Sequence, residues 1–241
     1  MQVYRGMDVG TAKPTAEERA RVPHHLLDLV DPEVDYAVAE YQHDARAAIA
    51  AIEDRGRRAL LVGGTGLYLR AIVDDLCFPG RFPEVAAQLE AEPDTEVLHR
   101  RLAALDPIAA ARMEPTNRRR VVRALEVTLG SGRRFSDHGP GLEAYPPTAF
   151  VLRGLRLPRP VLDERIAHRY TQQLADGFLD EVTRLAPRAL SRTAGQALGY
   201  RELLAHVRGE MTLDAAVDLA VVRTRRFARR QERWFRRDPR I

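Results

Sequence analysis

The sequence predicts an α/β protein in which a parallel-sheet core is interrupted by a helical insertion. A short apolar run at residues 59–62 leads through a glycine turn into a helical pattern, the order that connects strand to helix in open parallel sheets. A second apolar run at residues 149–157 indicates another strand, whereas residues 79–142 show helical patterns without a convincing strand. We therefore predict a core formed by residues 1–78 and 143–241, with residues 79–142 as the insertion.

The N-terminal part is expected to alternate between loop, helix and strand. Residues 1–14 are predicted to be extended and then to form a loop, after which Thr15 is suited to cap a short helix. The apolar run at residues 25–30 is a candidate buried strand. Residues 36–53 place apolar side chains three and four positions apart, which predicts an amphipathic helix that Gly56 ends.

Helical patterns dominate the sequence after the second apolar run. We expect helices at residues 159–176, 177–186, 196–207 and 213–236. Two stretches are strongly basic: residues 222–241 hold nine arginines against two acidic residues, and residues 112–134 hold seven against two. They favour a polyanionic partner, either a nucleic acid or a phosphorylated metabolite; the alternative is a solvated, salt-bridged helix surface. Phe227 and Trp234 are expected to anchor the last helix in the core.

Composition narrows the class of protein. The single cysteine, Cys77, excludes a disulfide framework, and no apolar run approaches the roughly 20 residues that span a bilayer. We therefore predict a cytoplasmic protein without membrane association. The histidines show no metal-binding spacing. The only lysine, Lys13, follows Ala12 and precedes Pro14, so the sequence holds no phosphate-binding loop of the form G-x-x-x-x-G-K-[ST].

The segment GGTGLY, residues 63–68, is a candidate anion-binding turn. It places the backbone N–H groups of Gly63 and Gly64 and the hydroxyl of Thr65 at the start of a helix, a geometry that suits a phosphate ester. The alternative is a tight strand-to-helix turn with a purely structural role.

Two pairs of arginines recur at a spacing of four residues, which puts each pair on one helix face. Arg165 and Arg169 could clamp a pyrophosphate through charge-assisted, bidentate hydrogen bonds; the alternative is a solvated face that pairs with acids such as Asp163. Arg119 and Arg123 lie beside an apolar stripe and suit contact with a nucleic-acid backbone; the alternative is an ordinary surface helix.

Six segments, read in order, resemble the bacterial tRNA dimethylallyltransferases: QVYRGMDVGTAKP, PHHLLDLVDP, LVGGTGLYLRA, RRRVVRALEV, QALGYREL and TRRFARRQERWFR. The resemblance implies a P-loop NTPase-like core with a helical insertion that contacts tRNA. It also implies transfer of a dimethylallyl group from dimethylallyl diphosphate to N6 of adenosine 37 in tRNAs that read codons starting with U. The implied reaction uses Mg²⁺, releases pyrophosphate and flips the adenine out of the anticodon loop. A monomer is the expected state.

The resemblance also assigns residues to roles, with no protein ligand for a metal. Catalytic roles fall to Thr65 and Arg165, and the diphosphate would be held by Arg165, Arg169, Gly63 and Gly64. Contacts with the tRNA anticodon stem-loop would come from Met1, Gln2, Thr65, Arg119, Arg120, Arg123, Gln196, Gly199, Tyr200 and Arg201. The family commonly has an arginine about 21 residues after its threonine, where this chain has Ala86.

In the family, a strand, the phosphate-binding loop, its helix and a general-base aspartate precede the residue that matches Met1. The resemblance therefore predicts that the P-loop strand and helix and this aspartate are missing from the chain, which would transfer little or no prenyl group by itself. A late-called start codon or a fragment is the expected reason. Two other functions stay open from the residues alone: a P-loop nucleotide kinase or other phosphotransferase, and a non-catalytic RNA-binding protein.

Overall fold

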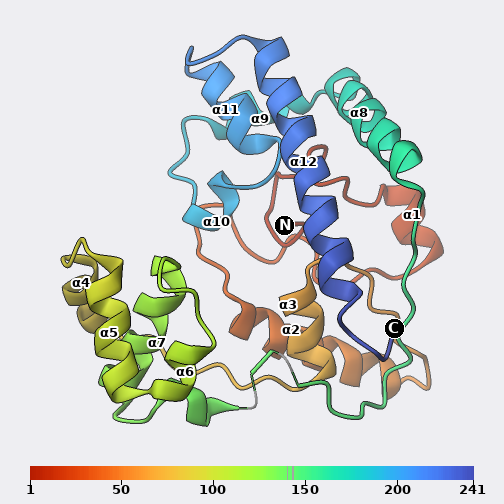
Figure 1. Cartoon of the computed structure of the whole chain (residues 1–241). Helices are drawn as coiled ribbons and strands as arrows, with labels where there is room; N and C mark the ends of the chain where they lie inside the picture. The colour runs from red at the N-terminus through yellow and green to blue at the C-terminus, as the bar shows by residue number, and fades with distance from the viewer. Residues whose placement is uncertain (140, 143) are drawn as a thin grey trace. The chain divides into compact units, whose positions relative to one another are not determined.

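The computed structural model describes residues 1–139, 141–142 and 144–241 (Figure 1). The chain divides into two compact units, one formed by residues 1–73 and 150–241 and the other by residues 74–149. Glu143, where the second core segment was predicted to begin, lies outside the described residues. The predicted division, with residues 79–142 as an insertion that contacts tRNA, stays a prediction.

The first unit is built from helices and long connecting loops. Its helices are α1 (Ala16–Arg21), α2 (Val38–Glu53), α3 (Gly66–Val73), α8 (Arg159–Ala175), α9 (Phe178–Leu185), α10 (Arg192–Gly195), α11 (Tyr200–Val207) and α12 (Leu213–Phe235). Most lie within a few residues of the predicted bounds. The exception is the region of α10 and α11, where one helix was predicted over residues 196–207. Gly199 has φ +83°, a conformation that interrupts a helix, so α11 begins only at Tyr200.

Local capping explains where the N-terminal helices begin and end. The Thr15 side chain accepts a hydrogen bond from the Glu18 N–H at 3.2 Å, and the Glu18 carboxylate accepts one from the Thr15 N–H at 2.8 Å. This capping box confirms the predicted start of α1. After α2, Gly56 takes φ +66° and its N–H bonds the Glu53 carbonyl at 2.7 Å.

The predicted strands are wrong for the part of the chain that the structure describes. Its only strand-like pairing is an isolated parallel bridge between Tyr4 and Val30. Residues 59–62 and 149–157 are without regular structure, and the side chains of Leu60, Val62 and Leu155 are fully or almost fully exposed. An apolar run becomes a strand only when neighbouring strands share its hydrogen bonds and cover its side chains. Here no such neighbour is present, so the described residues form no sheet core.

The N-terminal loop contributes directly to the hydrophobic core of the first unit. Val3, Tyr4 and Met7 are buried in the same cluster as side chains of α9 and α11. Phe178 of α9 meets Tyr200 of α11 edge to face, with ring centroids 4.9 Å apart. The loop is therefore held by helices that follow it by more than 150 residues in the sequence.

The second unit is helical throughout its described regular structure, with α4 (Pro83–Glu90), α5 (Thr95–Leu105), α6 (Pro107–Ala111), α7 (Arg118–Ser131) and the 3₁₀ turn η1 (Phe135–His138). Leu98 and Leu102 of α5 pack with Val121 and Leu125 of α7 in its core. Across both units, none of the described helices combines the length and apolarity needed to cross a bilayer.

Candidate functional site

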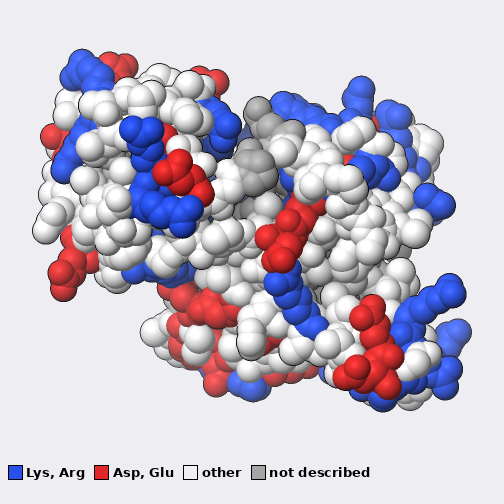
Figure 2. Space-filling view, turned by 90° about the horizontal axis from the view of Figure 1, so that it is seen from below, with Lys and Arg blue, Asp and Glu red and all other residues white. Residues whose placement is uncertain are grey.

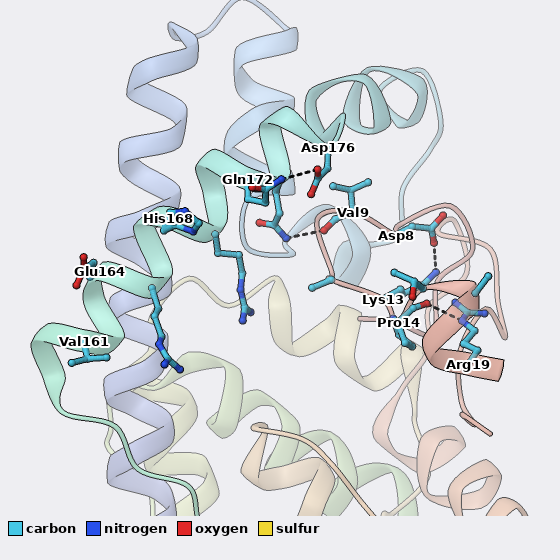
Figure 3. Close-up of a pocket in the computed structure, with 16 residues that line it drawn as sticks. Asp8, Val9, Lys13, Pro14, Arg19, Val161, Glu164, His168, Gln172 and Asp176 are labelled. Carbon is cyan, nitrogen blue, oxygen red and sulfur yellow. Dashed lines mark hydrogen bonds and ion pairs between the residues drawn. The ribbon is translucent and has the colours of Figure 1, made fainter. Parts of the chain in front are cut away.

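A cavity of about 1010 Å³ lies in the first unit between α8 and the N-terminal loop (Figure 3). One wall is a face of α8, formed by Val161, Glu164, Arg165, His168, Arg169, Gln172, Gln173 and Asp176. The other wall comes from the loop and the start of α1, formed by Asp8, Val9, Ala12, Lys13, Pro14, Thr15, Ala16 and Arg19. Charged and polar groups from both walls thus line one space.

Arg165 and Arg169 both line this cavity, as their shared helix face predicts. Among the described residues, neither guanidinium has a hydrogen-bonded or ion-paired partner. The predicted alternative partner, Asp163, is engaged elsewhere: it pairs with Arg159 at 2.8 Å and accepts no bond from the cavity pair. Two free cations therefore stand side by side on the α8 wall, an arrangement that suits a polyanionic ligand.

Lys13 holds the opposite wall together. Its side chain is only 2% exposed, and its Nζ donates to the Tyr4 carbonyl at 2.6 Å and to the carboxylates of Asp8 and Asp28 at 2.6 and 2.5 Å. The three donors of an ammonium point in tetrahedral directions, whereas the donors of an arginine guanidinium all lie in one plane. Burial by itself raises the pKa of Asp28, but the hydrogen bonds from Lys13 and Arg19 outweigh this effect and keep that pKa below its ordinary value.

Sequence reasoning missed this role of Lys13, although a signal existed. Lys13 is the single lysine among 38 basic residues, which sets this position apart from all the others that carry arginine. Because Lys13 and Asp8 neutralise each other and Arg19 pairs with Asp28 at 3.2 Å, the loop wall adds little free charge. The cations available to an anion are therefore Arg165 and Arg169, which share the α8 wall with the carboxylates of Glu164 and Asp176.

The glycine turn does not line this cavity. Gly63, Gly64 and Thr65 are absent from both of its walls, whereas Arg165 belongs to the α8 wall. The turn packs on α12 instead: Gln231 donates to the Gly64 carbonyl at 2.7 Å, and a Cβ on Gly66 would come within 2.0 Å of the Trp234 ring. Close packing thus explains these two glycines, and the Thr65 side chain remains exposed.

The three arginines of α7 that are predicted to contact tRNA differ in whether their side chains are free to bind a partner. Arg119 and Arg120 are exposed. Arg123 is held within its own unit, where it donates to the Pro79 carbonyl at 2.7 Å and pairs with Glu126 at 2.8 Å. Only the first two are therefore free to meet a partner without breaking internal bonds.

The predicted contacts at residues 196–201 divide in the same way. Gln196 and Arg201 are exposed, whereas Gly199 and Tyr200 are buried. The Tyr200 hydroxyl donates to the Glu181 carboxylate at 2.5 Å. At the N-terminus, Met1 is 44% exposed, and the Gln2 amide is bonded to the loop carbonyls of residues 11 and 12.

Some arginines of the C-terminal helix α12 are held by other residues of the chain, and others are exposed. Arg223 pairs with buried Glu202, and Arg225 donates to the Asp163 carbonyl at 3.1 Å. An exposed arginine stripe remains at spacings of three and four residues, formed by Arg226, Arg229, Arg230 and Arg233 of α12 and by Arg236 and Arg237 just after its end. On the molecular face in Figure 2, basic side chains form several patches separated by acidic and uncharged ones.

Comparisons with known proteins agree with one another. A family model described as IPP transferase matches residues 2–238. A tRNA dimethylallyltransferase of Streptomyces avermitilis is 51% identical over 246 residues, covering 100% of this chain and 78% of that protein. A tRNA dimethylallyltransferase of Geobacter metallireducens is 46% identical, covering 100% of this chain and 80% of that protein.

Solved structures give the same answer for the fold. A tRNA isopentenylpyrophosphate transferase from Bacillus halodurans superposes with a TM-score of 0.69 at 40% identity, covering 99% of this chain and 77% of that one. A eukaryotic dimethylallyltransferase acting on tRNA superposes with a TM-score of 0.78 at 24% identity, covering 97% of this chain and 61% of that one. At that identity the second likeness speaks for the fold alone.

Proposed function

The chain belongs to the IPP transferase family, and on that premise we propose that it transfers a dimethylallyl group from dimethylallyl diphosphate to N6 of adenosine 37 in tRNA. The substrates are tRNAs that read codons starting with U. The observation that supports this most directly is a pair of guanidinium groups, Arg165 and Arg169, that have no partner among the described residues and lie beside a cavity large enough for a prenyl diphosphate.

The reaction breaks the bond between the allylic carbon and the diphosphate oxygen and forms a bond between that carbon and N6. The adenine loses one N6 proton, and pyrophosphate leaves with the bonding electrons. Negative charge therefore grows on the leaving group, and cations already fixed in place lower the barrier. Arg165 and Arg169 are proposed for this role, and Thr65 is proposed to contact the target base.

Mg²⁺ is proposed as the cofactor, held chiefly by the diphosphate. Among the described residues, no group of three or more acidic, histidine or cysteine side chains could hold a metal ion. Mg²⁺ fits such a site because it keeps several waters and commonly binds substrate phosphates with few protein ligands. When bound there, it would neutralise part of the charge on the departing pyrophosphate.

We propose that exposed arginines and one exposed glutamine bind the anticodon stem-loop. They are Arg119 and Arg120 of α7, Gln196 and Arg201 near α11, and the arginine stripe of α12. Replacing Arg226, Arg229, Arg230 and Arg233 with glutamine should weaken tRNA binding and flatten its salt dependence, because each phosphate that is no longer neutralised lowers the logarithmic slope by about 0.7–0.9. Unchanged binding would show that α12 has only a structural role.

The direct test incubates the 241-residue chain with dimethylallyl diphosphate, Mg²⁺ and unmodified tRNA. Mass spectrometry of the digested tRNA then measures N6-dimethylallyladenosine. The family resemblance predicts little or no transfer by this chain alone, a prediction that the comparisons do not support, and robust turnover would contradict it. Binding is therefore measured in parallel by fluorescence anisotropy of a labelled anticodon stem-loop.

The two alternatives predict different results in the same assays. A phosphotransferase would bind a small nucleotide and would not bind tRNA. A non-catalytic RNA-binding protein would bind tRNA with the same affinity whether or not pyrophosphate is present. The comparisons support neither alternative. A chain that neither transfers the prenyl group nor binds both tRNA and pyrophosphate would overturn the proposal.

A further inference from the structure

One buried carboxylate gathers the backbone of the N-terminal loop. Glu181 of α9 is 2% exposed, and its oxygens accept hydrogen bonds from the N–H groups of Asp8 and Val9, each at 2.8 Å, and of Gly10 at 3.2 Å. Three successive amides on one carboxylate fix the direction of the loop over these residues. No sequence pattern pointed to this contact, which joins segments more than 170 residues apart.

Tyr200 completes the coordination of this carboxylate. Its hydroxyl donates to Glu181 Oε1 at 2.5 Å, and its side chain is 1% exposed. Burial, and then the neighbouring carboxylate, raise the pKa of Tyr200, so the phenol keeps its proton and stays a donor. The buried carboxylate thus has four donors, which is what a charged group shielded from water needs.

The loop is also fixed to α8, the helix that carries the arginine pair. Gln173 Nε2 donates to the carbonyl of Val9 at 2.7 Å and to that of Gly10 at 3.3 Å. On its other side Gly10 lets the loop pack closely on α9 and α11, since a Cβ there would lie 2.1 Å from the Phe178 ring and 2.6 Å from the Tyr200 ring. Asp8 and Val9 in turn line the cavity across from α8 (Figure 3), the helix that contributes Arg165 and Arg169 to the lining.

We infer that Glu181 and Tyr200 are positioning residues of the diphosphate subsite. They hold the loop wall at a set distance from the arginine wall, so that the cavity keeps its shape before the ligand enters. This inference rests on the proposed function. It also gives Tyr200 a different role from the tRNA contact that the family resemblance assigns to it.

Pyrophosphate is the probe for the test, with binding measured by isothermal titration calorimetry on the full 241-residue chain. Tyr200→Phe removes one donor and keeps the ring, and should weaken pyrophosphate binding about threefold to tenfold because the loop wall shifts. Glu181→Gln should weaken it more, since its amide group presents N–H to the N–H groups of the loop. Binding of the anticodon stem-loop should change less than about twofold in Tyr200→Phe, because the loop wall faces the diphosphate subsite.

Tyr36→Phe is the matched control. Tyr36 is also buried and also donates to a carboxylate, Asp44 at 2.8 Å, but among the described residues the hydrogen bonds that anchor residues 8–10 to α8 and α9 come from Glu181 and Gln173 and not from this pair. It should leave pyrophosphate binding unchanged. If Tyr200→Phe folds and binds pyrophosphate as the wild type does, or weakens pyrophosphate and RNA binding in equal measure, the positioning role is refuted.

Amide hydrogen exchange separates this inference from the proposed function. Tyr200→Phe should speed exchange at Asp8, Val9 and Gly10, whereas Tyr36→Phe should not. A wild-type chain that binds no pyrophosphate would refute the diphosphate subsite itself. Unaltered exchange in Tyr200→Phe would refute the anchoring of the loop, whatever the chain binds. Tyr200→Phe keeps the test valid even if Glu181→Gln fails to fold.

Discussion

Helices α7 and α8 carry arginines at the same spacing but use them differently. On α8, Arg165 and Arg169 line a cavity and have no partner among the described residues. On α7, Arg119 is exposed while Arg123 is bound to Glu126 and to backbone carbonyls. A spacing of four residues therefore predicts that two side chains share a helix face, but their availability to a ligand depends on acceptors that tertiary packing brings near.

The strongest test of this contrast removes the α8 pair. Replacing Arg165 and Arg169 with alanine should weaken pyrophosphate binding by about 100-fold, since each charge-assisted hydrogen bond contributes about 1.5–3 kcal/mol. Thermal stability should hardly change, because neither side chain has an internal partner to lose. Calorimetric titration and a melting curve measure the two effects. A large fall in melting temperature with unchanged binding would make this pair structural, like Arg123.

The reverse outcome is expected on α7. Arg123→Gln should lower the free energy of unfolding by about 1–3 kcal/mol, because buried Glu126 and the carbonyl of Pro79 lose a charged donor. Chemical denaturation followed by circular dichroism measures this loss. The matched control is Arg119→Gln on the same helix, which should leave stability unchanged. If both variants unfold alike, the distinction between bound and free arginine on α7 is wrong.

Lys13→Arg extends the contrast to the only lysine. The guanidinium is larger and planar, so it should not reach Tyr4, Asp8 and Asp28 at once, and we expect a loss of about 1–2 kcal/mol in unfolding free energy. Arg19→Lys offers a comparison at a more exposed position of the same network and should cost less. Equal stability of Lys13→Arg and the wild type would show that any cation serves there.

The smallest expected effect is on RNA affinity through one exposed arginine. Arg119→Gln should weaken binding of the anticodon stem-loop about twofold to fivefold at low salt, with the difference shrinking as salt rises. Anisotropy titrations at several salt concentrations measure it. A salt-independent loss would indicate a shaped contact with a base in place of a phosphate contact.

Helices were predictable from the sequence because their determinants are local. Thr15 and Gly56 mark ends that side-chain and backbone chemistry set within a few residues. Residues 59–62 have the apolar composition of a buried strand, but composition does not show whether a second strand lies beside them. A strand depends on hydrogen bonds to a segment that can lie anywhere in the chain, and none forms here among the described residues.

The candidate site was predictable to the same local extent. Periodicity identified the shared face of Arg165 and Arg169. It could not identify Glu181, because this carboxylate binds backbone N–H groups that are remote in the sequence. Every residue except proline has such an N–H group, so no residue type at positions 8–10 indicates the contact. At the glycine turn, the sequence pattern suggested a phosphate-binding site that the packing does not require. Close contacts with Trp234 and Gln231 already account for the glycines.

The burial of Lys13 gives the chain a built-in chemical reporter. As the only lysine, it supplies the only side-chain amine, and in the folded loop that amine is shielded from solvent. An acylating reagent would therefore find no lysine to modify until the loop opens. The rate at which label accumulates at this one residue would measure how often the loop detaches from its anchors, without any engineered probe.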